Sequence, residues 1–137
     1  MEKLKLLEFL IPRRPVSLQT SNRENLRAWK AYVSEVASEN WSQGIIQDGT
    51  DLKVTLVYLC DDLPPDVDNI IKPIQDAMVG VVYEDDIQIS DVDSHRRYLS
   101  DTIVVTGLPQ ILVDAVSNGE EAVYVKVTLA EELGEYL

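Results

Sequence analysis

Strands are predicted wherever apolar residues recur at every second position along the chain. This pattern marks residues 3–11, residues 51–60 and residues 122–129. The intervening positions of residues 51–60 are only partly polar, so we expect this strand to be covered on both faces. Weaker alternation predicts a strand over residues 87–99 and a short strand over residues 103–105.

Helices are predicted where apolar residues recur at steps of three and four positions. Residues 22–37 show this period first, and residues 108–116 show it last. Residues 68–78 show it as well, but Pro73 falls inside this segment and is expected to distort its first turn. The order of strands and helices predicts an α/β (α+β) fold, a single domain over residues 1–137 with a mixed sheet and flanking helices.

Composition leaves few classes of protein open. Of the 137 residues 45% are hydrophobic, which suffices for one core. No run approaches the roughly 18–20 uncharged apolar residues of a membrane span. The first residues are too rich in charge for a secretory signal, and the single cysteine, Cys60, excludes an internal disulfide. We therefore expect a cytoplasmic protein with no membrane partner.

Charge is distributed unevenly, and this bears on which partners the chain can bind. The formal net charge is −12, whereas nucleic-acid-binding proteins usually carry a basic surface. Residues 1–30 nevertheless hold seven basic and three acidic side chains, against five and 21 in residues 31–137. A basic end on an acidic body is able to offer a local phosphate-binding face.

Carboxylates crowd into one stretch, DLPPDVDNIIKPIQDAMVGVVYEDD, which is followed by Asp86. Between Asp66 and Asp86 the only cation is Lys72. The spacing of Asp68, Lys72 and Asp76 places them on one side of the predicted helix. A helix followed by a turn and a strand folds back on itself, so the later acidic residues are expected to approach the earlier ones. This acidic stretch contains Asp66, Asp68, Asp76, Glu84, Asp85 and Asp86.

Two interpretations of the acidic stretch stay open from the residues alone. Several aspartates without histidine or cysteine beside them are the oxygen ligands that suit Mg²⁺ or Mn²⁺. Such an ion activates water for phosphodiester hydrolysis, and Lys72 beside it is able to contact the phosphate. The alternative is a solvated turn in which Asp66 or Asp68 only caps the helix. A calcium-binding EF-hand is disfavoured, because Ile71 stands where its loop needs glycine.

The order of residues in the acidic stretch resembles the core motif of the RusA family of Holliday-junction resolvases. The pattern is D-x-D-N-x-x-K-P-x-x-D-A-M, then a glycine, then Y-E-D-D-x-Q-I. A weaker similarity is the segment IPRRPVS, which resembles the opening strand and loop of that family. The matching motif residues are Asp66, Asp68, Asn69, Lys72, Pro73, Asp76, Ala77, Met78, Gly80, Tyr83, Glu84, Asp85, Asp86, Gln88 and Ile89.

The resemblance implies a RusA-like endodeoxyribonuclease domain that resolves four-way DNA junctions in recombination and repair. It implies a homodimer that makes paired nicks and depends on Mg²⁺ or Mn²⁺. Carried over to this sequence, Asp66, Asp68 and Asp86 are metal-binding and catalytic carboxylates, and Lys72 is the catalytic lysine. Asp85 is implied as a further metal ligand.

The same resemblance implies supporting and DNA-binding residues. Asn69 would orient its loop, and Asp76 would bind Lys72 rather than a metal ion. Branched DNA would be contacted by the basic side chains at the start of the chain and after the acidic stretch. These are Arg13, Arg14, Arg23, Arg27, Lys30, Arg96 and Arg97.

Other functions compete with this interpretation. The charge of −12 would suit a catalytically inactive RusA-like protein that binds or regulates a basic protein partner, although a lost activity gives no reason to retain Lys72 among the acids. A Mg²⁺-dependent nucleotide phosphohydrolase would need a glycine-rich phosphate loop, which the six glycines do not form. His95 has no serine or cysteine motif with which to build a catalytic triad.

Overall fold

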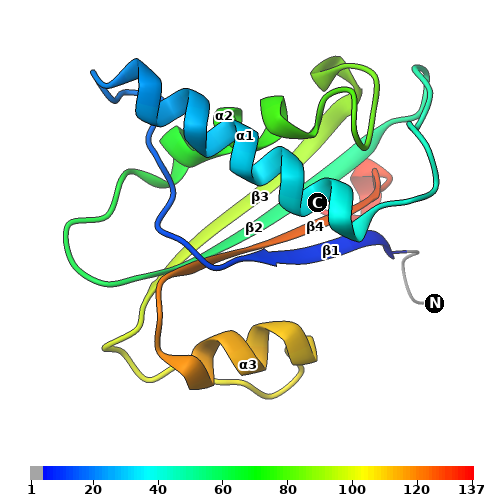
Figure 1. Cartoon of the computed structure of the whole chain (residues 1–137). Helices are drawn as coiled ribbons and strands as arrows, with labels where there is room; N and C mark the ends of the chain where they lie inside the picture. Colours follow the sequence, from blue (N-terminus) through cyan, green and yellow to red (C-terminus); the bar gives the residue numbers. More distant parts are fainter. Residues whose placement is uncertain (1–4) are drawn as a thin grey trace.

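The computed structural model describes residues 5–137 and has a four-stranded mixed sheet with helices on both faces (Figure 1). Strand β4 is antiparallel to both β1 and β2, whereas β2 and β3 are parallel. The predicted α+β class, with a mixed sheet and flanking helices, is thus confirmed. The strands are β1 (Lys5–Ile11), β2 (Leu52–Cys60), β3 (Ile89–Tyr98) and β4 (Ala122–Leu129), in the spatial order β1-β4-β2-β3.

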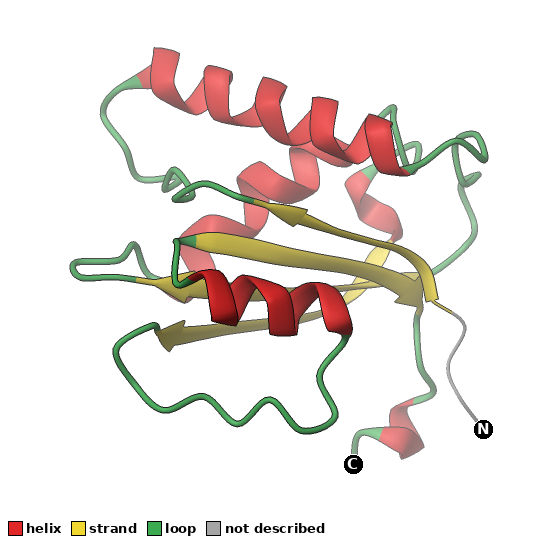
Figure 2. Cartoon of the chain, turned by 60° about the horizontal axis from the view of Figure 1, so that its bottom comes forward, coloured by secondary structure: helices red, strands yellow, loops and turns green. Residues whose placement is uncertain are grey.

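Helices α1 (Arg23–Asn40) and α2 (Ile71–Met78) cover one face of the sheet, and α3 (Gln110–Asn118) lies on the other face (Figures 1 and 2). α1 begins where the sequence predicts, because the Asn22 side chain accepts a hydrogen bond of 3.0 Å from the third backbone N–H of the helix. α3 ends at Gly119, whose φ of +68° is a conformation that glycine adopts freely.

The main core fills the space between the sheet and the two helices on its first face. Apolar side chains at helical spacing on α1 and at alternate positions on β2 meet there, and burial of each contributes about 1.5–3 kcal/mol. A smaller cluster lies under α3 and includes Leu59, Leu112 and Tyr124. Since side chains of β2 enter both clusters, its predicted coverage on both faces is confirmed.

The segment after β3 differs from the prediction. Residues 103–105 do not form a strand but belong to an irregular connection between β3 and α3. These β-branched residues favour extended backbone, yet a strand also needs a neighbour, and Ile103 packs instead against the cluster under α3. The strand predicted over residues 3–11 is confirmed from Lys5 onward, and its first two residues lie outside the described ones.

Two element boundaries also shift from their predicted positions. The helix predicted from residue 68 begins as a 3₁₀ helix, η1 (Val67–Ile70), so Pro73 falls in the first turn of α2, where a missing N–H costs no helical hydrogen bond. The strand predicted from residue 87 is preceded by a second 3₁₀ helix, η2 (Asp86–Gln88). Within residues 5–137, no helix is long and apolar enough to cross a membrane.

Candidate active site

The acidic stretch lies on the sheet face that α1 and α2 cover, next to the outer strand β3. The Ser94 hydroxyl on β3 donates a hydrogen bond of 3.3 Å to the Val67 carbonyl oxygen in η1. The loop after β1 is held to η1 by a bond of 2.9 Å from the Leu18 N–H to the Asn69 carbonyl oxygen. The two segments that resemble the family motif are therefore joined, and Asn69 joins them through its backbone.

Lys72 connects the two halves of the acidic stretch. Its Nζ lies 3.0 Å from Oδ1 of Asp76, one turn further along α2, and contacts Oδ2 of Asp86 beyond the turn. The hydrogen bond from Lys72 lowers the pKa of Asp86 below its usual range. The bonds to Asp86 and then Asp76 raise the pKa of Lys72. Lys72 is therefore an ammonium ion at neutral pH, suited to contact an anion and unsuited to act as a base.

A second cation reaches the acidic stretch from α1. The Nζ atom of Lys30 lies 3.5 Å from Oδ2 of Asp76, the carboxylate oxygen that Lys72 does not contact. Arg23, Arg27 and Lys30 are spaced i, i+4, i+7, so they form one stripe along α1 that ends at Asp76. The sequence predicted Lys30 as a DNA contact but gave no sign of this ion pair, because the pair depends on how α1 packs against α2.

Asp66 and Asp68 have no side-chain partner among the described residues. Asp66 stands at the N-cap position of η1, yet its side chain makes no capping hydrogen bond. Asp68 follows in the first turn of η1, and both side chains are exposed. The capped-turn interpretation therefore does not account for either carboxylate.

The turn that carries Asp85 and Asp86 is fixed by a buried glutamine. Gln88 is 2% exposed, and its Oε1 accepts two backbone N–H groups of the same turn, at 2.9 and 3.2 Å. Its Nε2 donates to three backbone carbonyls of residues 46–50. Asp85 caps η2 by accepting a bond of 3.0 Å from the Ile87 N–H. Gln88 matched the motif without an assigned role, and the structure gives it this positioning role.

The ligand chemistry of the acidic stretch suits a hard divalent cation. All its candidate ligands are carboxylate oxygens, two of the carboxylates are unpaired, and Asp86 contacts Lys72 through a single oxygen. Within residues 5–137, however, no three His, Cys, Asp or Glu side chains are gathered closely enough to hold a metal ion. The donor set therefore fits Mg²⁺ or Mn²⁺, and the gathering of these side chains around an ion stays a prediction.

Like Lys30, the predicted DNA contacts Arg13 and Arg14 interact with other residues of the chain. The Arg13 guanidinium lies over the ring of Tyr32 on α1, 3.6 Å from its centroid. Arg14 forms an ion pair of 3.1 Å with Glu121 and also donates to the Asp62 carbonyl oxygen. Tyr32 projects from the side of α1 opposite Arg23, so Arg13 lies on the other flank of the helix from the basic stripe, whereas Arg14 holds together the loops at the far end of β2.

The predicted DNA contacts on β3, Arg96 and Arg97, point to opposite faces of the sheet, because successive side chains of a strand alternate. Arg97 lines a cavity under α3 together with Val57 and Leu59. Arg96 is directed to the face that carries the acidic stretch. The structure therefore separates Arg97 from the candidate site.

Comparison with known families tests the resemblance over a larger part of the chain. The sequence model described as "Endodeoxyribonuclease RusA" matches residues 12–106. The chain belongs to the RusA family. The matched region contains the whole acidic stretch with Lys72 and Gln88, and it ends before α3 and β4 begin. Membership indicates endodeoxyribonuclease activity of the junction-resolving kind. A search of the curated proteins gave no match.

Proposed function

We propose that the chain is a Mg²⁺-dependent endodeoxyribonuclease that resolves four-way DNA junctions by paired nicks. The observation that carries this proposal is the position of Lys72 between Asp76 and Asp86, close in sequence to the unpaired Asp66 and Asp68. A lysine held by two carboxylates is a fixed cation, and it lies within the part of the chain that matches the family.

In this proposal Asp66, Asp68 and Asp86 hold the metal ion, with Asp85 as a further ligand. When bound, Mg²⁺ or Mn²⁺ activates water and offsets the charge that develops on the phosphate. Lys72 supplies a preorganised cation for a phosphate oxygen.

Two positioning residues keep the reactive side chains in place. Asp76 holds the Lys72 ammonium from one side, at 3.0 Å. Asn69, through its carbonyl oxygen, keeps the loop after β1 against η1.

The basic stripe of α1 is proposed as the path of one DNA arm. Arg23, Arg27 and Lys30 lead along the helix to Asp76, so a phosphate backbone that follows them arrives at the acidic stretch. Arg96 extends the surface on β3, whereas Arg13, on the ring of Tyr32, lies on the other flank of α1 and is proposed as a separate contact. Neutralisation of phosphates by these side chains releases counterions and drives binding.

A homodimer is part of the proposal, because paired nicks require two sites. One chain carries one acidic stretch with one Lys72, and a junction is resolved only when two opposite strands are cut. Two copies related by a twofold axis would present two such sites to the symmetric arms of a junction.

The decisive experiment is cleavage of an end-labelled four-way junction with and without Mg²⁺, at low and moderate salt, with linear duplex as the control. We expect nicks in opposite strands of the junction only, lost with EDTA and restored by Mg²⁺ or Mn²⁺. Binding of the junction without cleavage in the presence of metal would refute the proposed enzymatic activity and would favour an inactive RusA-like binding protein. Failure to bind at low salt would favour a protein partner.

A further inference from the structure

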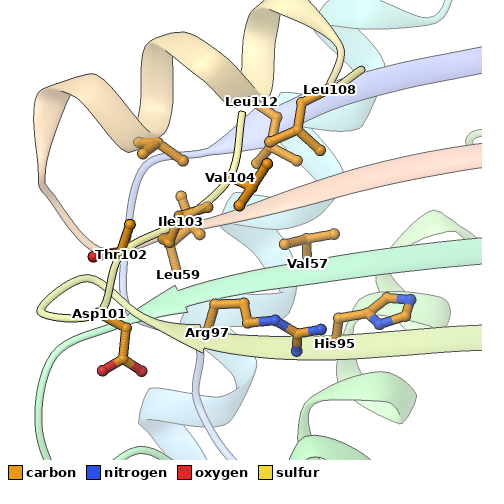
Figure 3. A pocket seen from close by; sticks show the side chains of 11 residues that line it. Val57, Leu59, His95, Arg97, Asp101, Thr102, Ile103, Val104, Leu108 and Leu112 are labelled. Carbon is orange, nitrogen blue, oxygen red and sulfur yellow. The ribbon is translucent and has the colours of Figure 1, made fainter. Parts of the chain in front are cut away.

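A cavity of about 540 Å³ lies on the sheet face opposite the acidic stretch, between β2, β3 and α3 (Figure 3). Its volume falls within the roughly 300–1,000 Å³ of small-molecule sites. Most of its wall is apolar, and seven residues form that part: Val57, Leu59, Ile103, Val104, Leu108, Leu112 and Val116.

The cavity exists because α3 is too short to cover the whole sheet. Its nine residues span about 14 Å, and it packs towards β1 and β4. The irregular connection between β3 and α3 crosses the uncovered part without filling it. The far wall, formed by α3 and Leu108, lies beyond the part of the chain that matches the family, so the match covers only part of the cavity lining.

The open side of the cavity carries a positive charge without an ion partner. Figure 3 shows the guanidinium of Arg97 and the ring of His95 next to each other along β3. One Arg97 nitrogen donates a hydrogen bond of 2.9 Å to the carbonyl oxygen of Arg96. No ion pair among the described residues involves Arg97.

Neither carboxylate near this side neutralises Arg97. Asp101 lines the cavity, but Figure 3 shows its carboxylate turned away from the apolar wall. Asp93, on the same face of β3, is paired with Lys53 at 3.0 Å. Arg97 is exposed at the rim of the apolar cavity, and a guanidinium without an ion partner is able to form a charge-assisted hydrogen bond with an anion there.

We propose that the cavity binds a small amphipathic monoanion, a molecule with an apolar chain or ring system and one carboxylate or sulfonate. The apolar body would lie against Val57, Ile103 and Leu112. The acid group would accept hydrogen bonds from the Arg97 guanidinium, with His95 beside it. This site is separate from the proposed nuclease site, and its test does not depend on DNA cleavage.

The first test uses the fluorescent anion 8-anilinonaphthalene-1-sulfonate and the neutral probe N-phenyl-1-naphthylamine. We expect Arg97→Gln to weaken binding of the anion about tenfold and to leave binding of the neutral probe nearly unchanged, because only the charge-assisted bond is removed. Arg96→Gln is the matched control, since this neighbour on β3 points to the other face and both affinities are expected to stay the same. Val104→Trp, on the exposed wall of the cavity, is expected to weaken both probes.

A second test needs no variant. Octanoate is expected to displace the anionic probe from the wild-type protein at concentrations about tenfold lower than octanol, which has the same chain without the charge. Equal competition by the two, unsaturable binding, or an unchanged affinity in folded Arg97→Gln would overturn the proposal. Probe binding that falls as a dimer forms in sedimentation would instead assign this surface to a second copy of the chain.

Discussion

Asp68 is an exposed carboxylate without a partner among the described residues, so its substitution tests catalysis without disturbing the fold. Asp68→Asn is expected to lower junction cleavage at least about 100-fold, because the variant lacks a proposed metal ligand. The free energy of unfolding is expected to change by less than about 0.5 kcal/mol, since the side chain has no partner in the fold. Cleavage rates and urea denaturation measure the two effects, and Asp114→Asn on α3 is the control. Full activity in Asp68→Asn would refute its assignment.

Lys72 is expected to contribute to stability in a pH window that its pKa and that of Asp86 define. The pKa of Asp86 is lowered from 3.8, so its stabilisation is present above that pH and is lost as the pH falls through the lower folded value. The pKa of Lys72 is raised from 10.5, so its stabilisation is lost only at higher pH. The pair is partly exposed, and its screened contribution is at most about 1 kcal/mol.

Lys72→Met tests this window by urea denaturation over a pH series. The difference from wild type is expected to be level between about pH 5 and 9 and to shrink as the pH falls below 3.8 towards the lowered pKa of Asp86 in the folded protein. Arg27→Met, an exposed cation on α1, is expected to give a smaller difference without this step. A Lys72→Met difference that grows in acid would contradict the lowered pKa of Asp86.

Among the elements, those decided by their own side chains were predictable from the sequence. β4 has the predicted bounds, because alternating valines select a strand, and α1 begins after Asn22, which caps it. Residues 103–105 have the same β-branched composition but no neighbouring strand, so local pattern alone was misleading there. The start of the α-helix before Pro73 shifted by about a turn, because 3₁₀ and α-helices have similar sequence patterns.

The candidate site shows the same division between local and long-range information. The Lys72–Asp76 pair follows from i, i+4 spacing, and the approach of Asp86 follows from the chain folding back after α2. The Lys30–Asp76 pair requires the packing of two helices that lie far apart in sequence. The role of Gln88 requires the loop of residues 46–50, which no pattern in the sequence connects to it.

The Gln88 side chain holds η2 to the loop of residues 46–50. Gln88→Leu removes every hydrogen bond that this buried side chain makes to the backbone and is expected to destabilise the protein by about 2–4 kcal/mol. Cleavage by the fraction that stays folded is expected to fall as well, because Asp86 loses its fixed position. Thermal denaturation and activity at low temperature measure both effects, with the exposed Ser90→Ala as control. A stable and fully active Gln88→Leu would remove this positioning role.

At the scale of the whole molecule, the net charge of −12 conceals a separation of charge between surfaces. Arg23, Arg27 and Lys30 form a stripe along α1 that ends at its contact with α2, while Lys5, Arg14 and Lys53 are neutralised by acidic partners elsewhere. DNA binding is a property of one surface, because charges beyond about 8–10 Å are screened at physiological salt. Acidic residues far from α1 are therefore expected to oppose DNA binding on the proposed path less than the net charge suggests.

The salt dependence of junction binding tests this separation. The double variant Arg23→Gln/Arg27→Gln is expected to bind a four-way junction more weakly and to reduce the slope of log Kd against log salt by about two, one for each phosphate that is no longer neutralised. Arg97→Gln changes the net charge by half as much, but on the opposite face, and is expected to leave the slope unchanged. Fluorescence anisotropy of a labelled junction over a salt series measures both. If Arg97→Gln lowered the slope and the α1 variant did not, the DNA path would lie over the α3 face, and the stripe that ends at Asp76 would be an ordinary solvated helix surface.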